Sequence, residues 1–299
     1  LERKSPAGQR PLADTDTLAD WRSDPNDPVF GRRVRHPRWT YTPPVTFGDG
    51  REVTLAIAPD GAEGLFEELV DSATSHLEIL VYTWDQPRLA RRVADAARRG
   101  VRVRVLLDGS PAGGIDLAQR WAAWELARAG AEVMWHDNAG VVARRCAGGH
   151  AKLWVADGAR VLVATENPSR GSLPIDDDPA DGTSGRRGMA GLLESESLAG
   201  WAEAIIDDDM GPGATDARPY QFADPIRGAP PTDYRPPESE SLAGYEARTP
   251  SQLTVPGPIQ GHAFAAPEPD AATDDGLLAL LSRARRGSTV EAWQLREPL

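Results

Sequence analysis

The sequence is short of cysteine, of lysine and of long apolar runs, and each shortage narrows the class of protein. Its one cysteine, Cys146, excludes an internal disulfide framework and a zinc module built on several cysteines. No run of about 18 apolar residues occurs, so no segment predicts a membrane-spanning helix. Only two lysines occur, Lys4 and Lys152, and 45 acidic residues against 33 Lys+Arg give a net charge of −12. That charge disfavours unselective nucleic-acid binding, which needs a basic surface.

The first 43 residues show no sustained periodicity. They are rich in Pro, Arg and Asp, which predicts an extended or disordered N-terminal arm. Segments 1–6 and 21–23 resemble the closing strands of a lamin-tail domain, so the end of such a domain is the alternative interpretation of residues 1–43. The chain begins with Leu1 and shows no signal-peptide pattern, so we expect a fragment of a longer protein. Its localisation stays open, with a peripheral membrane or a secreted full-length form among the alternatives.

Helical and strand patterns alternate from about residue 45 onward. Predicted helices cover 63–73, 85–100, 116–129 and 195–206, and predicted strands cover 77–82, 101–107, 132–135, 151–155 and 160–165. The β-α-β-α-β order predicts a parallel α/β core. We assign a first lobe to 44–210, a Pro-rich linker to 211–256, and the start of a second lobe to 257–299.

The assignment of a second lobe depends on an internal repeat. Apolar residues at 277, 280, 281 and 284 follow those at 66, 69, 70 and 73 at a constant offset, and 290–293 matches 79–82 at the same offset. A helix followed by a strand is therefore repeated. By the same spacing, the second copy would reach its counterpart of His150 only beyond Leu299, so the second lobe is expected to be incomplete.

The stretch 149–158, Gly-His-Ala-Lys-Leu-Trp-Val-Ala-Asp-Gly, holds the densest group of chemically active side chains. Asp157-Gly158 between two apolar runs predicts a hairpin with a two-residue turn. That turn would pair His150 with Thr165 and Lys152 with Val163. Because side chains alternate between the faces of a strand, His150, Lys152, Thr165 and Asn167 are expected on one face, and Glu166 on the other. An imidazole, an ammonium, a hydroxyl and an amide on one patch suit a phosphate anion.

Two other interpretations of this stretch remain open. One is a purely structural hairpin with an exposed polar face. The other is a zinc site, whose candidate ligands are His136, Asp137, Cys146 and His150, although the Cys146-x3-His150 spacing is unusual for zinc.

His150-x-Lys152-x4-Asp157-Gly158, followed by Ala-Thr-Glu-Asn at 164–167, resembles the H-x-K-x4-D…G-S-x-N signature of the phospholipase D superfamily. Members carry two such motifs, in one chain or across a dimer. Carried over, His150 is one of two catalytic histidines: one attacks phosphorus to form a phosphohistidine, and the other protonates the leaving oxygen and later activates water. Lys152 and Asn167 hold the phosphate oxygens, and Thr165 replaces the usual serine. Asp157, in the turn, is interpreted as structural. The resemblance implies no cofactor and no metal.

The sequence also departs from the family. Many members place an acidic residue downstream of the asparagine to orient the histidine, but this chain has Arg186-Arg187-Gly188 in that neighbourhood. Asp85 and Asp108, at the ends of predicted strands, are the remaining candidates for that role.

The resulting prediction is an α/β, phospholipase D-like lobe with a mixed β-sheet flanked by helices and an incomplete second lobe. The predicted function is a phosphodiester hydrolase or phosphatidyltransferase of cardiolipin synthase-like character. It needs a second HxK motif from the same full-length chain or a dimer partner, so this stretch alone is expected to be weak or inactive. The acidic charge favours a phospholipid over nucleic acid. The alternatives are a non-catalytic binding or scaffold protein and a nuclease of the same superfamily.

Overall fold

The structure, a computed structural model, describes residues 2–3, 21–22, 42–137, 148–173, 186–214, 216–236, 252–265, 282–283 and 285. The chain divides into two compact units, Thr46–Gly261 and a second made of Leu1–Val45 with His262–Leu299. In the second unit, β1 (Glu2–Arg3) pairs antiparallel with β2 (Trp21–Arg22). The rest of the predicted N-terminal arm, and nearly all of the predicted repeat at 277–293, lie outside the described residues.

The first unit is built on a mixed sheet in which nine strands are described. These are β3 (Val45–Ala58), β4 (His76–Val81), β5 (Arg102–Asp108), β6 (Glu132–His136), β7 (Lys152–Ala156), β8 (Arg160–Ala164), β9 (Gly188–Glu194), β10 (Ala217–Pro219) and β11 (Gln252–Ala263). Their order is β10-β6-β5-β4-β7-β8-β9-β3-β11. Strands β4, β5 and β6 run parallel, and the pairs from β4 through β7, β8 and β9 to β3 are antiparallel. The prediction of a mixed sheet flanked by helices is confirmed.

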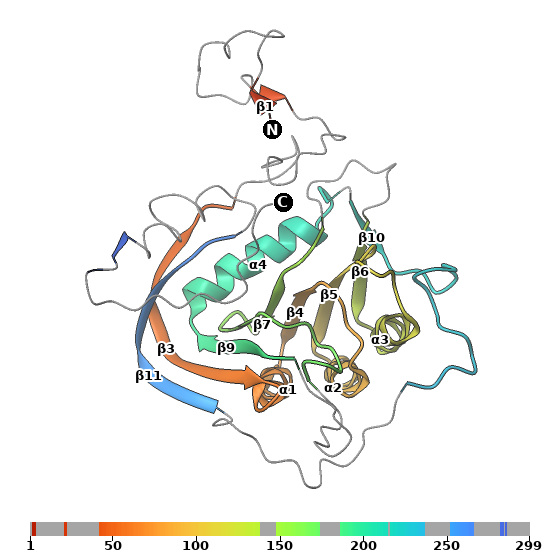
Figure 1. Cartoon of the computed structure of the whole chain (residues 1–299), viewed down its shortest axis with the longest axis horizontal. Coiled ribbons are helices and arrows are strands. Elements are labelled where there is room, and N and C mark those ends of the chain that lie inside the picture. Colours follow the sequence, from red (N-terminus) through yellow and green to blue (C-terminus); the bar gives the residue numbers. More distant parts are fainter. Residues whose placement is uncertain are drawn as a thin grey trace. The chain divides into compact units, whose positions relative to one another are not determined.

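Helices cover both faces of this sheet (Figure 1). On one face lie α1 (Ala62–Ser72), α2 (Pro87–Arg98) and α3 (Leu117–Arg128), and on the other lies α4 (Glu196–Met210). The main core fills the space under α1–α3, where Phe66, Ile79 and Trp154 are fully buried. These helices match the apolar spacings in the sequence, since the residues at helical period are the ones that the sheet buries. Among the described helices, none is both long and apolar enough to cross a bilayer.

Side-chain caps begin helices α2 and α4. The Gln86 side chain accepts a hydrogen bond from Leu89 N at the start of α2, next to Pro87. Ser195 accepts one from Leu198 N at the start of α4. Each side chain accepts from one of the backbone N–H groups that have no partner within the helix. Pro87 and Ser195 were therefore sufficient to predict where these two helices start.

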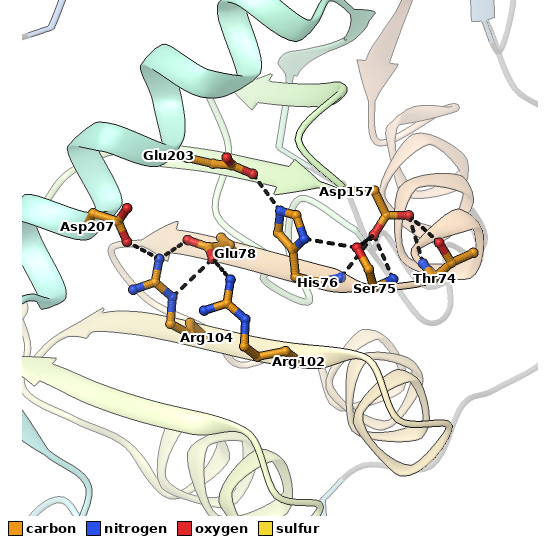
Figure 2. Close-up of polar contacts among 9 residues, drawn as sticks. All are labelled: Thr74, Ser75, His76, Glu78, Arg102, Arg104, Asp157, Glu203 and Asp207. Carbon is orange, nitrogen blue, oxygen red and sulfur yellow. Dashed lines mark hydrogen bonds and ion pairs between the residues drawn. The ribbon is translucent and has the colours of Figure 1, made fainter.

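Ionic contacts hold α4 on its face of the sheet (Figure 2). The guanidinium of Arg104 on β5 bridges Glu78, whose side chain is 2% exposed, and Asp207 on α4. At the start of β4, His76 Nε2 lies 2.6 Å from Glu203 Oε1. These contacts place α4 over the end of the sheet where β4 and β5 begin.

The segment predicted as a linker, 211–256, contains sheet structure that the sequence did not indicate. Strand β10 pairs antiparallel with β6, with Ala217 opposite His136, and Tyr220 and Tyr234 pack against the core. Strand β11 begins inside the same segment and lies beside β3 at the other edge. Edge strands tolerate proline and need no apolar alternation, because one side of the strand is not paired, and this is why the pattern was missed. The domain boundaries themselves remain predictions.

Candidate active site

The ends of several strands bring the motif residues to one edge of the sheet. Strand β7 is antiparallel to β4 with Lys152 opposite Val81, so β7 begins where the parallel strands β4 and β5 end. Strand β8 ends and β9 begins at the same edge, with Ala164 opposite Ala190. The segments 82–86 and 165–167, which follow β4 and β8, and 149–151, which precedes β7, therefore lie at this edge. In α/β folds this is the usual place for a ligand site.

His150 and Lys152 lie against one another at this edge. The Lys152 ammonium is 3.0 Å from Nδ1 and 3.2 Å from Nε2 of His150, so it lies over the imidazole, and it donates to the His150 carbonyl at 2.8 Å. The ring of Tyr82, just past β4, is 4.9 Å from the imidazole and 5.8 Å from the ammonium. His150 is exposed while Lys152 is 6% exposed. An exposed imidazole thus has a buried cation directly against it.

The predicted register of the hairpin was wrong by one residue. Ala159 N donates to Ala156 O, as the predicted turn requires, but the Cα partner of Ala156 is Arg160. Ala159 is an extra residue, and its carbonyl accepts from Ser195 N at the start of α4. Such a bulge shifts the pairing by one and moves every later side chain of β8 to the opposite face.

The shift changes which neighbours Lys152 has. Its partner position on β8 is 164 rather than 163, so by alternation Glu166, and not Thr165, is on the face of Lys152. Thr165 is exposed, and its hydroxyl bonds Met189 O at 3.4 Å and accepts from Met189 N at 2.9 Å. The expectation that Thr165 joins His150 and Lys152 on one face is therefore corrected: its hydroxyl is engaged with the backbone of β9.

Asn167 reaches the same edge from beyond the end of β8. Its Oδ1 accepts from Thr83 N at 3.4 Å, which ties the loop after β8 to the loop after β4. The amide oxygen is used in this contact, and its NH2 group supplies the donors that a phosphate oxygen would need.

Burial changes the acid–base behaviour of Lys152. It lowers the pKa of the ammonium from 10.5 to about 8, and the negative charge of Glu166 opposes that change. Around neutral pH Lys152 is therefore still cationic, but it loses its charge far below the range of an ordinary lysine.

We expect Lys152 to titrate near pH 8. Because its pKa is lower in the folded chain than in the unfolded chain, the unfolded chain binds more protons between pH 8 and 10.5, so this group should make the free energy of unfolding rise over that range. Reductive ¹³C-methylation followed by NMR would report the titration, since the sequence has only one other lysine, Lys4. Lys152→Arg assigns the signal, and a midpoint near 10.5 for Lys152 would contradict the expectation.

Asp157 is at the opposite end of β7, in the turn (Figure 2). Its carboxylate accepts five hydrogen bonds from residues 74–76: the backbone N–H groups of Thr74, Ser75 and His76 and the hydroxyls of Thr74 and Ser75, at 2.8 to 3.0 Å. Burial alone would raise its pKa, but these hydrogen bonds outweigh burial and hold the pKa of Asp157 well below its usual range. The carboxylate thus links the β7–β8 turn to the loop before β4, at the opposite end of β7 from His150.

Asp108 and Asp85, the two candidates for orienting His150, differ in their relation to it. Asp108, at the end of β5, accepts from Gly149 N at 2.9 Å and so holds the backbone beside His150. Asp85 accepts from Arg170 N at 3.0 Å and pairs with that arginine's side chain. Asp108 therefore bears on the position of His150 through the chain, and Asp85 holds the loop after β8.

His136 and Asp137, two of the four candidate zinc ligands, are paired with other side chains. His136 Nε2 is 3.2 Å from Asp216 Oδ2, and Asp137 pairs with Arg218 and Arg227. Cys146 lies outside the described residues. In the part of the chain that the structure describes, no group of three or more His, Cys, Asp or Glu side chains is arranged to hold a metal ion.

Sequence reasoning missed Tyr82 and Glu166 as neighbours of the motif. Tyr82 directly follows a buried strand, a position that by itself does not indicate a role in a site. The assumed two-residue turn assigned Glu166 to the wrong face of the hairpin. Gly188 was an available signal, because a glycine at the start of a strand, with no turn to require it, indicates that another group lies close to it.

Comparisons with known proteins find similarity to one protein family and to several solved structures. Residues 66–180 match the family model described as a cardiolipin synthase, PLD-like domain. Similar solved structures are a phospholipase D family member, Nuc from Salmonella typhimurium (18% identity, TM-score 0.47, covering 60% of this chain and 99% of that one), and NucT from Helicobacter pylori (13%, 0.40, 52% and 92%). A third is phosphatidylserine synthase from Haemophilus influenzae Rd KW20 (14%, 0.38, 56% and 39%). No curated protein sequence matches the chain significantly. The family match includes the strand that begins at Lys152, so residues 66–180 of this chain are similar to a PLD-like domain.

Proposed function

We propose that the protein is a phosphodiester hydrolase or phosphatidyltransferase that works through a phosphohistidine intermediate. The observation that carries the proposal is the contact of the Lys152 ammonium with the exposed imidazole of His150 at the edge of the sheet. An imidazole is a nucleophile and a proton carrier near neutral pH, and an adjacent cation stabilises the negative charge that builds on phosphate oxygens in the transition state.

The chemistry needs two histidines. In the first step an imidazole nitrogen forms a bond to phosphorus while the P–O bond to the leaving group breaks, and the leaving oxygen takes a proton from the other histidine. In the second step water, or an alcohol in a transferase, attacks phosphorus, gives its proton to that other histidine, and the N–P bond breaks. We assign one of the two histidine roles to His150, and the contacts to the non-bridging oxygens to Lys152 and the amide of Asn167.

The second HxK motif must come from the rest of a full-length chain or from a dimer partner, and a surface suited to such a partner lies beside the site. On the sheet face opposite α1–α3, Val163 is 54% exposed, Met189 43% and Leu55 37%. Strand register places Val163 and Leu55 in one row across β8, β9 and β3, both opposite Gly191. Contiguous exposed apolar side chains at a site edge are typical of an interaction surface.

We expect Val163→Arg to reduce phosphodiester cleavage by the two-motif protein about tenfold or more, because a charge in this row opposes burial against a partner. The isolated unit should keep its melting temperature, since Val163 is exposed. Cleavage rate and sedimentation equilibrium together measure both effects. Val255→Arg on β11 is the comparison variant, at an exposed position (39%) on another strand. An unchanged rate in Val163→Arg would contradict the partner surface.

The substrate class is tested directly with full-length protein. Release of nitrophenolate from bis(p-nitrophenyl) phosphate reports phosphodiester cleavage, and parallel assays use phosphatidylglycerol vesicles and single-stranded DNA. The net charge of −12 favours a phospholipid, because nucleic acid would be repelled by an acidic surface. Faster cleavage of DNA would make the protein a nuclease. No cleavage of any of the three, with a second HxK motif present, would leave a non-catalytic binding or scaffold protein.

A further inference from the structure

The site has an acidic neighbour that the motif itself does not assign. Glu166 follows the end of β8, where the β8–β9 register puts Ala164 opposite Ala190. Two residues on, Glu166 is opposite Gly188, the first residue of β9. By the β7–β8 register it also lies on the face of Lys152, in the row next to it.

The side chain of Glu166 occupies the volume that a side chain at position 188 would need. A Cβ built on Gly188 would be 2.0 Å from Cγ of Glu166 and 2.6 Å from its Cδ and Oε1. Gly188 is not among the glycines with positive φ, so its backbone does not require glycine. The lack of a side chain at position 188 is therefore explained by space. The space beside Gly188, here called the cradle, is occupied by the Glu166 side chain.

A second contact holds the carboxylate in this cradle. The hydroxyl of Ser172 donates to Glu166 Oε2 and itself accepts from the hydroxyl of Ser169 at 3.1 Å, and Ser172 is fully buried. A side chain with three rotatable bonds is thereby held both along its stem and at its carboxylate, which is the requirement for a residue that positions another group.

The charge of Glu166 acts on Lys152. Burial lowers the pKa of Lys152 to about 8, and the attraction of Glu166 is the force that opposes this decrease. The other ionisable side chains in described contact with the ammonium are His150 and Tyr82, and neither is a carboxylate. Without Glu166, the buried amine would have no described carboxylate to favour its charged form.

We propose that Glu166, held in the cradle left by Gly188, is the acidic positioning residue of this active site and fixes the Lys152 ammonium beside His150. This inference rests on the proposed function for its effect on the reaction, but its effect on Lys152 is measurable without turnover.

The test combines isosteric, steric and exchange variants of the full-length protein. Glu166→Gln should lower the pKa of Lys152 by about one unit, measured by NMR of ¹³C-methylated lysine. It should also lower phosphodiester cleavage at pH 7 by up to about a hundredfold. Gly188→Ala should act in the same direction, because its methyl group expels the Glu166 side chain. The exchange variant Glu166→Gly/Gly188→Glu, which supplies the carboxylate to the same space from β9, should recover most of both losses.

Matched controls separate position from general damage. Gly191→Ala is on the same strand and meets only the tip of the Leu55 side chain at 3.2 Å, and Glu194→Gln removes a carboxylate at the far end of β9. Neither should move the pKa of Lys152. If Glu166→Gln leaves that pKa unchanged, the inference is overturned, whatever the fold of the exchange variant. If instead the pKa falls but His150→Ala cleaves diesters normally, the positioning of Lys152 stands and the proposed function fails.

Discussion

Substituting His150 by alanine should reduce phosphodiester cleavage by the full-length protein by at least about a thousandfold. In the proposed mechanism the imidazole is the nucleophilic or proton-carrying group at the sheet edge, and the Lys152 ammonium 3.0 Å away has no other imidazole beside it among the described residues. Without His150 the reaction loses either its nucleophile or its proton carrier. The remaining rate then reflects only substrate binding and the positive charge of Lys152. Initial rates with bis(p-nitrophenyl) phosphate at pH 7 provide the measurement.

The chain contains a natural control for this substitution. Gly261-His262-Ala263 on β11 repeats the letters of Gly149-His150-Ala151, but Phe264 stands where the motif has lysine. His262→Ala should cleave at the rate of the unsubstituted protein. Equal rates for His150→Ala and the unsubstituted protein would refute the assignment of His150. A loss in both variants would point to damage unrelated to the motif.

The second large effect is expected on stability, at Asp157. Asp157→Asn should lower the free energy of unfolding by about 2 kcal/mol at pH 7, because hydrogen bonds to a charged acceptor are worth more than those to a neutral one. The amide NH2 would also face N–H and O–H donors of residues 74–75. Asn tolerates the left-handed backbone found here, φ 53°, so the variant isolates the carboxylate from backbone strain. Urea unfolding at several pH values measures the difference.

The pH dependence has a defined sign. The pKa of Asp157 is lower in the folded chain than in the unfolded chain, so its stabilising contribution is complete above the unfolded value near 4 and is lost as the pH falls through the folded value. The difference between the unsubstituted protein and Asp157→Asn should therefore shrink in acid. Folded Asp157→Asn should cleave diesters at an unchanged rate, since the carboxylate contacts residues 74–76. A selective loss of rate without loss of stability would assign Asp157 to the chemistry instead.

Most of the elements were predictable because their signals are local. The apolar period of α1 and the Pro87 and Ser195 signals depend on a few neighbouring residues, and the sheet buries the faces that the spacing indicates. Strands β10 and β11 were not predictable in this way. Their pairing depends on the open edges of a sheet formed by distant segments, and their own residues are largely exposed or rich in proline.

The sequence by itself determined the α/β class, the helix starts and the pairing of an imidazole with an ammonium two residues apart, because each follows from a fixed local period or spacing. The tertiary structure decided which other side chains join them. A single extra residue, Ala159, whose carbonyl accepts from Ser195 N, reverses the faces of β8 beyond the turn. That reversal puts Glu166 on the face of Lys152 and leaves the Thr165 hydroxyl bonded to the backbone of β9. No local pattern carries this information, since the register of the hairpin is set by a hydrogen bond to a residue 36 positions further along the chain.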